Sequence, residues 1–307
     1  MRALVAGRDV AGGAEVREVG EPAVDPGSAL VRVTAVSLNR GEVRALGRAE
    51  DGWRPGWDLA GVVERAATDR PGPSEGTRVV GLVTGGAWAE LVAVPTRQLA
   101  PIPDGVTDSE AATLPVAGLT ACWTLRLAGA SPEHRVIVTG AAGGVGWFAV
   151  QLAAHEGADV TAVVGRPERG EGLTELGAAT VSVGMPDSGA YHTILESAGG
   201  RSLAAALRIV APHGTIVSYG NSSGEKTEFD VSDFYPRSGA RLCGFLIFAE
   251  VERSGGATAD LMALAQLIAD GHLETQISLE ADWRQSADAF QALLDRQVRG
   301  KAVLHLG

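Results

Sequence analysis

The chain has 307 residues, of which 45% are hydrophobic, 41 are glycine and 2 are cysteine. At roughly 100–200 residues per domain, this length predicts about two domains with cores of their own, which excludes a disordered tail or a disulfide-stapled miniprotein. The 26 basic and 37 acidic residues give a net charge of −11. Such a charge would repel a phosphate backbone, so nucleic acid is not an expected partner.

The cysteines and the hydropathy of the chain indicate in which cellular compartment the protein is expected. Cys122 and Cys243 stand alone, without a C-x-x-C pattern or a His-rich tract, so neither a disulfide framework nor a thiolate zinc site is expected. No uninterrupted apolar run approaches the ~18 residues that a membrane span requires. We therefore expect a cytoplasmic protein that does not use a membrane as a partner.

Residues 1–112 read as short strands between turns. Their β-branched segments are bounded by Gly/Pro clusters, which is typical of a mostly-β lobe. The expected strands are residues 29–36, 60–65, 77–83 and 89–94. Thr107 and Glu110 have the spacing of a capping box and predict that a helix begins there.

Residues 113–247 alternate between apolar runs of strand length and helical stretches. The expected strands are 135–139, 160–164, 193–195 and 215–219, with intervening stretches at 145–155, 173–176 and 203–210. This alternation predicts an α/β fold with a doubly wound parallel sheet, the Rossmann arrangement.

Residues 248–307 follow an apolar run at 242–248. Two helices are expected at 257–270 and 284–297, with Gly271 and Gly300 at their ends, and a last strand at 302–306. Because a terminal strand usually pairs with a sheet already present, we expect this segment to return to the N-terminal lobe. The predicted domains are therefore 1–112 with 248–307, and 113–247.

A cluster of glycines between an apolar strand and an amphipathic helix is the sharpest motif. It contains Gly140, Gly143, Gly144 and Gly146. Such glycines let the backbone approach a pyrophosphate, whose charge then meets the free N–H groups and the dipole of the following helix. The spacing differs from the strict G-x-G-x-x-G, and a glycine-rich turn without a ligand stays open as an alternative. The flanking strands and helix favour a dinucleotide.

The tip of the second strand distinguishes the two nicotinamide dinucleotides. NAD-binding chains place a carboxylate there, about 20 residues past the last glycine, to hold the ribose 2′-hydroxyl. Here the tip reads Gly165-Arg166-Pro167-Glu168-Arg169. Arg166 and Arg169 can meet a 2′-phosphate with charge-assisted hydrogen bonds, which predicts NADPH rather than NADH. The alternative is a solvated turn in which both arginines pair with Glu168 and Glu171.

Several further motifs occur in a family-specific order: Val36-Ser-Leu-Asn39-Arg-Gly-Glu42, Pro55-Gly-Trp-Asp58-Leu-Ala-Gly61, Leu114-Pro-Val-Ala-Gly118-Leu-Thr120, Gly214-Thr-Ile-Val-Ser-Tyr219-Gly220 and Gly300-Lys301-Ala-Val-Leu. Together with the glycine loop they resemble the medium-chain dehydrogenase/reductase superfamily, in its zinc-independent quinone oxidoreductase and enoyl reductase branch. The resemblance implies a GroES-like substrate domain around a Rossmann domain, with the active site in the cleft between them. Zinc-using members need Cys and His ligands in the N-terminal lobe, which has neither, so no metal is expected.

The resemblance also implies roles for individual residues. Asn39 matches a cleft asparagine that hydrogen-bonds substrate or nicotinamide. Arg44 departs from the family pattern, because it stands where many relatives carry a tyrosine, so we expect water or solvent organised by Arg44 to deliver the proton. The alternatives are that Asn39 only caps a turn and that Arg44 is a solvated charge paired with Glu42 or Glu50. The expected cofactor-binding residues are Thr120, Gly140, Gly143, Gly144, Val145, Gly146, Gly165, Arg166, Arg169, Ser197, Tyr219, Gly220, Asn221, Phe245, Leu246 and Lys301.

The implied function is an NADPH-dependent reductase that transfers hydride to a quinone or to the activated C=C of an α,β-unsaturated carbonyl compound. Two alternatives stay open: an enoyl reductase dedicated to a carrier-bound biosynthetic intermediate, and a protein that binds NADPH without turnover. A Ser222 motif resembling a hydrolase nucleophile elbow lacks the helix that must follow it. An apolar edge strand near residues 242–248 predicts a homodimer.

Overall fold

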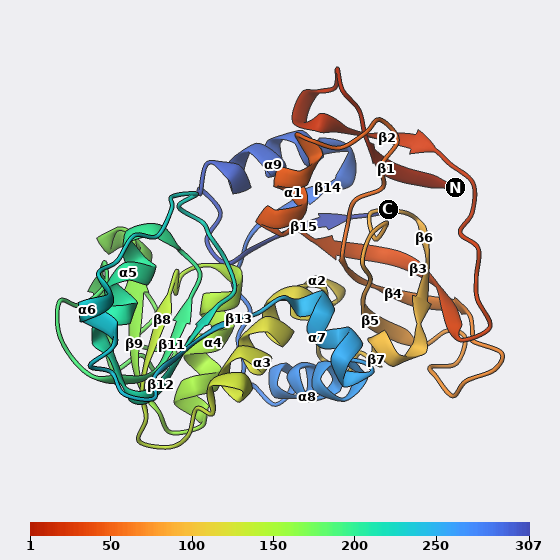
Figure 1. The fold of residues 1–307 in the computed structure, drawn as a ribbon. Coiled ribbons are helices and arrows are strands. Elements are labelled where there is room, and N and C mark those ends of the chain that lie inside the picture. The colour runs from red at the N-terminus through yellow and green to blue at the C-terminus, as the bar shows by residue number, and fades with distance from the viewer. The chain divides into compact units, whose positions relative to one another are not determined.

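A computed structural model describes residues 1–307 and divides into two units (Figure 1). Unit 1 comprises Met1–Leu119 and Val251–Gly307, and unit 2 comprises Thr120–Glu250. The sequence-based boundaries fell at residues 112 and 248. The first differs because the π-helical segment η3 (Leu114–Gly118) packs on strands β4 and β5 of unit 1.

Unit 1 is built on a seven-stranded sheet in the order β14-β15-β3-β4-β5-β7, with β6 paired to β3. Its strands are β3 (Ser28–Ser37), β4 (Asp58–Arg65), β5 (Arg78–Leu82), β6 (Leu91–Pro95), β7 (Leu99–Pro101), β14 (Ile277–Asp282) and β15 (Lys301–His305). A separate antiparallel hairpin contains β1 (Arg2–Ala6) and β2 (Ala14–Glu18). The expected mostly-β lobe is confirmed. The expected return of the last strand is also confirmed, since β15 pairs antiparallel with β3.

Short helices cover this sheet, and aromatic side chains fill the core beside it. Trp88 and Phe290 stack there with ring centroids 5.1 Å apart. The helices are α1 (Arg40–Leu46), α2 (Asp108–Ala112), α8 (Thr258–Ala269) and α9 (Ser286–Leu294), with single turns η1 (Ala11–Gly13), η2 (Thr96–Gln98) and η5 (Trp283–Gln285). The capping box at α2 is confirmed, because Thr107 Oγ1 accepts from Glu110 N and Glu110 Oε2 accepts from Thr107 N.

Unit 2 is a six-stranded, all-parallel sheet in the order β10-β9-β8-β11-β12-β13. Its strands are β8 (Arg135–Thr139), β9 (Asp159–Val164), β10 (Thr180–Val183), β11 (Tyr191–Glu196), β12 (Val210–Ser218) and β13 (Arg241–Gly244). Numbered within the unit, this is the 3-2-1-4-5-6 order of the Rossmann fold, which confirms the prediction. The interior strands are buried on both faces, so they read as continuous apolar runs in the sequence.

The helices of unit 2 differ from expectation in two segments. The helices of this unit are α3 (Leu119–Ala128), α4 (Gly144–His155), η4 (Pro167–Gly170), α5 (Gly200–Ile209) and α6 (Val231–Phe234). Residues 173–176 form turns instead of a helix, since Gly172 and Gly177 on either side adopt positive φ. The apolar run at 242–248 splits into the end of β13 and the start of α7 (Ile247–Ser254).

The last predicted helix, at residues 284–297, is shorter in the structure. It starts at Ser286, after the turn η5, and ends at Leu294, where Arg296 turns the chain with φ 60°. Gly300 therefore does not end this helix and instead precedes β15, whereas Gly271 follows α8 with positive φ as expected. We find no helix with the length and apolar character needed to cross a bilayer.

Candidate cofactor-binding site and a buried polar cluster

The order of strands in unit 2 reverses between β8 and β11, and the loops that follow these strands lie together. Ser197 N donates to Thr139 Oγ1 at 2.8 Å, and Ser197 Oγ donates to the Thr139 carbonyl at 3.1 Å. Ligands of doubly wound sheets bind at such a switch point, beyond the carboxyl ends of the strands. Thr139, which the sequence analysis did not single out, thus anchors the loop that carries Ser197.

The glycine loop between β8 and α4 is packed too tightly for side chains. Gly140 has φ +62°, and a Cβ there would lie 2.8 Å from Ser197 Oγ. A Cβ on Gly146 would meet the Gly140 carbonyl and lie 2.6 Å from Ala141 Cα. Gly143 is the N-cap of α4 and donates its N–H to the Gly140 carbonyl at 2.8 Å. The sequence requires glycine here so that the helix can start directly against the strand.

The first turn of α4 supplies the groups that a diphosphate needs. Gly144, Val145 and Gly146 are its first three residues, and the N–H groups of a first turn have no acceptor within the helix. These N–H groups and the positive end of the helix dipole favour an anion at this point. Gly140 is exposed, and Gly143 and Gly144 are half-buried, so a pyrophosphate can approach the backbone closely.

The Gly146→Ala substitution tests this packing. Its methyl group would press on backbone atoms, which cannot move aside, so we expect a loss of about 1–3 kcal/mol in unfolding free energy and weaker dinucleotide binding. Thermal unfolding measures the first effect. The matched control is Gly165→Ala, because a Cβ on Gly165 meets nothing within 4 Å and its stability should not change. Equal melting temperatures for the two variants would contradict this packing.

The tip of β9 carries the two predicted phosphate-binding arginines. Arg166 is 60% exposed and lies 3.5 Å from Glu168, which is 67% exposed. An ion pair between side chains this exposed contributes little and does not hold Arg166 in place. Arg169 lies in the following turn η4 and is half-buried. The pair of Arg166 with Glu168 agrees with the alternative of a solvated turn, and the contact of both arginines with a 2′-phosphate stays a prediction.

The loop after β12 forms the next part of the site. Tyr219 N donates to the Glu196 carbonyl at 3.0 Å, and Ser222 N donates to the Ser197 carbonyl at 3.0 Å. A Cβ on Gly220 would lie 2.9 Å from the same Ser197 carbonyl. Asn221 Oδ1 accepts from its own loop, from Gly224 N at 3.2 Å. The loops after β8, β11 and β12 are thus joined through Ser197.

The Tyr219 hydroxyl is buried close to the Ser197 side chain, without a hydrogen bond of good geometry. Burial raises the pKa of this hydroxyl above its ordinary value, so it stays neutral. A buried hydroxyl without a partner is costly, which is typical of a group that awaits a ligand. Together with the glycine loop and the two arginines, it makes a set of residues that fits a nicotinamide dinucleotide.

Three other predicted cofactor residues of unit 2 are placed less decisively. Phe245 N donates to the Ser218 carbonyl at 2.9 Å, so Phe245 and Leu246 follow the carboxyl end of β13 beside the end of β12. Leu246 is 62% exposed. Thr120 is buried in α3, where its carbonyl accepts from Thr124 Oγ1 at 2.6 Å. Their contacts with a cofactor stay predictions.

Unit 1 contains a buried polar cluster made of Ser37, Asn39, Glu42, Asp58 and Lys301. The Lys301 ammonium donates to the Leu38 carbonyl at 3.0 Å and to Asn39 Oδ1 at 2.7 Å, and lies 3.5 Å from Asp58 Oδ2. The Asp58 side chain is fully buried and that of Lys301 is 4% exposed. These three contacts use all three ammonium hydrogens. The role of Lys301 in binding a cofactor stays a prediction.

Asp58 and Glu42 share this cluster but differ in their hydrogen-bond partners. Asp58 Oδ1 accepts from Val116 N, and Oδ2 accepts from Ser37 Oγ, Asn39 Nδ2 and Lys301. Glu42 Oε1 accepts from Asn39 N and Nδ2, while its Oε2 has no partner. Burial raises the pKa of Glu42 well above its ordinary value, and the charge of Asp58 raises it further. Burial raises the pKa of Asp58 too, while Lys301 and the hydrogen-bond donors lower it, so we expect a proton to bind Glu42 before it binds Asp58.

The protonated state of Glu42 predicts a pH-dependent stability. A folded-state pKa above the ordinary value of 4.5 means that Glu42 stabilises the fold below that pH, and that this contribution falls as pH rises toward the folded-state pKa. The Glu42→Gln variant should not show this loss of stability. Its free energy of unfolding should therefore rise relative to that of the wild type by up to about 1.4 kcal/mol per pH unit above pH 4.5. Urea denaturation between pH 5 and pH 8 measures the difference. A difference that does not widen with pH would contradict a protonated Glu42.

Helix α1 carries the two predicted catalytic residues. Asn39 is its N-cap, which agrees with the capping alternative that the sequence left open, and its side chain also joins the polar cluster. Arg44 is exposed on the same helix. Burial lowers the pKa of Arg40, and the nearby charges of Arg44 and Arg296 lower it further. Arg44 is therefore part of a group of cations on unit 1.

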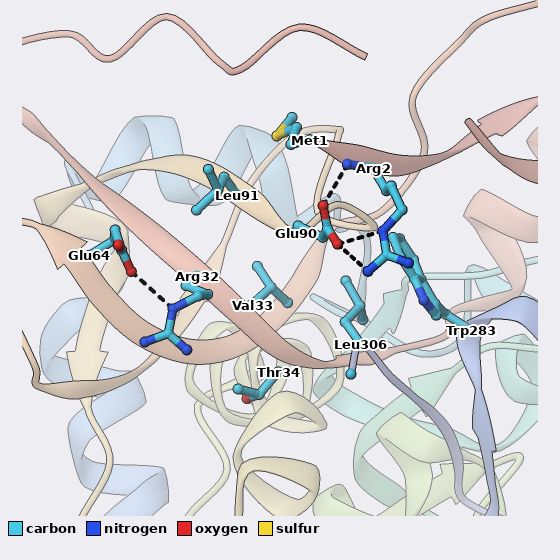
Figure 2. A pocket seen from close by; sticks show the side chains of 11 residues that line it. Met1, Arg2, Arg32, Val33, Thr34, Glu64, Glu90, Leu91, Trp283 and Leu306 are labelled. Atoms are coloured by element: carbon cyan, nitrogen blue, oxygen red, sulfur yellow. Dashed lines mark hydrogen bonds and ion pairs between the residues drawn. The ribbon is translucent and has the colours of Figure 1, made fainter. Parts of the chain in front are cut away.

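A separate pocket of about 380 Å³ lies over strands β3 and β6 of unit 1 (Figure 2). Its charges are paired within it: Arg2 Nε donates to Glu90 at 2.7 Å, and Arg32 Nε donates to Glu64 at 2.9 Å (Figure 2). None of the predicted site residues lines it. No group of three or more His, Cys, Asp or Glu side chains in the structure is arranged to hold a metal ion.

Comparisons with known proteins agree with both units. A family model described as an alcohol dehydrogenase GroES-like domain matches residues 25–104, and one described as a zinc-binding dehydrogenase matches residues 144–264. The chain belongs to the medium-chain dehydrogenase/reductase superfamily. This confirms the resemblance read from the motifs, and the two units are its GroES-like and Rossmann domains.

Individual members of the superfamily are similar over most of the chain. The spectinabilin polyketide synthase system protein NorB of Streptomyces orinoci is 34% identical over 298 residues, which cover 91% of this chain and 13% of NorB. The acrylyl-CoA reductase AcuI of Ruegeria pomeroyi is 33% identical over 207 residues, 62% of each protein. A mycobacterial protein solved with NADPH has the same fold, with a TM-score of 0.87 over the whole of both chains and 22% identity.

Proposed function

We propose that this protein is a zinc-independent, NADPH-dependent reductase that transfers hydride to a quinone or to the activated C=C of an α,β-unsaturated carbonyl compound. The observation that carries the proposal is the glycine loop Gly140–Gly146 at the switch point of the Rossmann sheet, with Arg166 and Arg169 at the neighbouring strand tip. The similar protein solved with NADPH and the similar acrylyl-CoA reductase support the cofactor and the activated C=C.

The residues of unit 2 would hold and orient the cofactor. The first turn of α4 would meet the diphosphate, Arg166 and Arg169 the 2′-phosphate, and the Tyr219 hydroxyl would find a partner in the ligand. When bound, NADPH supplies the hydride. The substrate's own carbonyl or quinone oxygen then accepts the electron pair, so the protein's contribution is alignment and exclusion of competing reactions.

The proposal is tested by following NADPH absorbance with a panel of quinones and enones. We expect NADPH to be oxidised with at least one class and NADH to be a poorer donor at equal concentration. Tight NADPH binding without oxidation by any acceptor would favour the alternative of a protein that binds the nucleotide without turnover.

A second candidate function is an enoyl reductase that acts on a thioester-linked intermediate. The similarity to a polyketide synthase system protein and to an acrylyl-CoA reductase favours it. So does the group of Arg40, Arg44 and Arg296 on unit 1, since clustered cations suit the phosphates of a thioester carrier. Saturation kinetics compare an enoyl-CoA with the enone that lacks its carrier. A KM at least tenfold lower for the thioester would select this candidate.

We also propose a homodimer formed through the edge of the Rossmann sheet. Strand β13 ends the sheet, and Leu242 and Leu246 on and beside it are 46% and 62% exposed. An unpaired apolar edge is a liability that pairing with a second copy removes. Light scattering should give twice the chain mass of 31.6 kDa, and Leu242→Glu should shift it toward the monomer. A wild-type protein that is monomeric at micromolar concentration would contradict the dimer.

A further inference from the structure

Glu196 is the last residue of strand β11, at the switch point of the Rossmann sheet, and it is 0% exposed. Its Oε1 accepts from Ala198 N at 3.0 Å, and its Oε2 accepts from Gly199 N at 2.9 Å. Thr139 Oγ1 lies 3.5 Å from Oε1. These hydrogen-bond partners are all neutral, so the carboxylate is buried among dipoles and not beside a cation.

The surroundings of Glu196 suit its charged form. Both of its oxygens accept from N–H groups, and an ionised carboxylate makes such hydrogen bonds most strongly. Helix α5 begins close by at Gly200, so the positive end of the helix dipole offsets part of the negative charge. Burial is the main cause of the raised pKa of Tyr219, and the charge of Glu196 raises it further. The field of this carboxylate therefore reaches the loop after β12.

The half of the sheet that contains Glu196 is the half expected to carry the nicotinamide. A Rossmann sheet consists of two mononucleotide-binding halves, and the dinucleotide lies across the point where they meet. The glycine loop and the arginines at the tip of β9 belong to the first half, which the proposed function assigns to the diphosphate and the adenosine ribose. The nicotinamide then lies at the carboxyl ends of β11, β12 and β13, all within unit 2.

We infer that the negative charge of Glu196 favours the oxidised, positively charged nicotinamide over the reduced one, and thereby favours hydride transfer to the substrate. The inference rests on the proposed function and deepens it. Hydride transfer moves two electrons and one proton from the dihydronicotinamide to the substrate, which then takes up a second proton from water, and it leaves one positive charge on the ring. A fixed negative charge on this side of the sheet stabilises that charge as it develops.

Calorimetric titration with NADP⁺ and NADPH tests the inference without turnover. Both ligands carry the same phosphates, so an effect of a substitution on the loop or on phosphate binding largely cancels in the ratio of their dissociation constants. Glu196→Gln removes the charge and nearly keeps the shape. Glu196→Ser also removes the charge and leaves room for water at the two N–H groups, so it serves where Glu196→Gln does not fold.

In both neutral variants the ratio of the Kd for NADP⁺ to the Kd for NADPH should rise at least about threefold. A unit charge about 10 Å from the ring, at an effective dielectric constant of about 20, would change the ratio about 15-fold, and nearby water reduces this effect.

Two controls separate the charge of Glu196 from its shape. Glu196→Asp keeps the charge on a shorter side chain, so its ratio should stay within about twofold of the wild-type ratio even where both affinities fall. Asp159→Asn removes an exposed carboxylate at the opposite, amino end of the same sheet and should leave the ratio unchanged.

Three results would overturn the inference. The first is a folded neutral variant that binds both nucleotides with the wild-type ratio. The second is a Glu196→Asp protein whose ratio shifts as far as that of Glu196→Gln, because shape and not charge would then be responsible. The third is a loss of both nucleotides in the neutral variants, which would show that Glu196 only holds the loop. Failure of the proposed function is distinct, since the wild type itself would then bind neither nucleotide.

Discussion

Lys301→Met is expected to lower the free energy of unfolding by about 3–5 kcal/mol, the cost typical of removing one partner of a buried ion pair. The Asp58 side chain is 0% exposed and the Lys301 side chain 4% exposed, so water cannot replace the lost ammonium. The Leu38 carbonyl and Asn39 Oδ1 would lose their donor as well. Urea denaturation at neutral pH measures the loss.

Two variants separate the loss of charge from the loss of packing. The Lys301→Met, Asp58→Asn double variant should recover much of the stability, since no uncompensated charge remains in the core. Lys226→Met should unfold like the wild type, because Lys226 is exposed. A loss below about 1 kcal/mol for Lys301→Met would mean that the cluster is hydrated and that its burial is not what holds Asp58.

Replacing both Arg166 and Arg169 by alanine is expected to weaken NADPH binding about 10- to 100-fold and to leave NADH binding nearly unchanged. A hydrogen bond to a charged group contributes about 1.5–3 kcal/mol, and the exposure of Arg166 places the expected effect of the double substitution below the sum for two such groups. Only NADPH carries the 2′-phosphate that these guanidinium groups would meet.

The ratio of the two dissociation constants, measured by calorimetry, reports this selectivity directly. Arg241→Ala is the control, because Arg241 begins β13 and is exposed at the opposite, amino end of the same sheet. An equal loss for NADPH and NADH in the double alanine variant would show that the arginines act on the diphosphate or on the fold. An unchanged ratio would remove the basis for NADPH selectivity.

Local patterns explain why much of unit 2 is predictable from the sequence. The glycine loop, the strand before it and the helix after it are contiguous in the chain, and a Cβ on Gly146 would meet backbone that lies only five residues away at Ala141. The tip of β9 likewise follows from counting residues past the last glycine. Long apolar strands buried on both faces carry a clear signal of their own.

The polar cluster of unit 1 could not be predicted in this way. Lys301 and Asp58 lie 243 positions apart in the sequence, and nothing local indicates that their side chains are buried together. Asp58 and Glu42 were visible only as members of motifs, and Lys301 was assigned to the cofactor by resemblance. Its buried contacts with Asn39 and Asp58 come from the pairing of β15 with β3, which brings the chain ends into one sheet.

The short helices also differ in how well the sequence predicts their ends. The capping box at Thr107 and Glu110 is a four-residue pattern and places the start of α2 correctly. The end of α9 depends on Arg296, which adopts φ 60°, although non-glycine residues rarely do. A sequence pattern therefore extends that helix to residue 297, whereas the structure ends it at Leu294.

We expect the glycine loop to bind the diphosphate of a phosphorylated nicotinamide dinucleotide. Isothermal titration of the wild-type protein with NADPH and with NADH tests it most directly, since no substrate needs to be known. We predict saturable binding of NADPH at one site per chain, at least tenfold tighter than that of NADH. No measurable binding of either nucleotide, or tighter binding of NADH, would contradict the account.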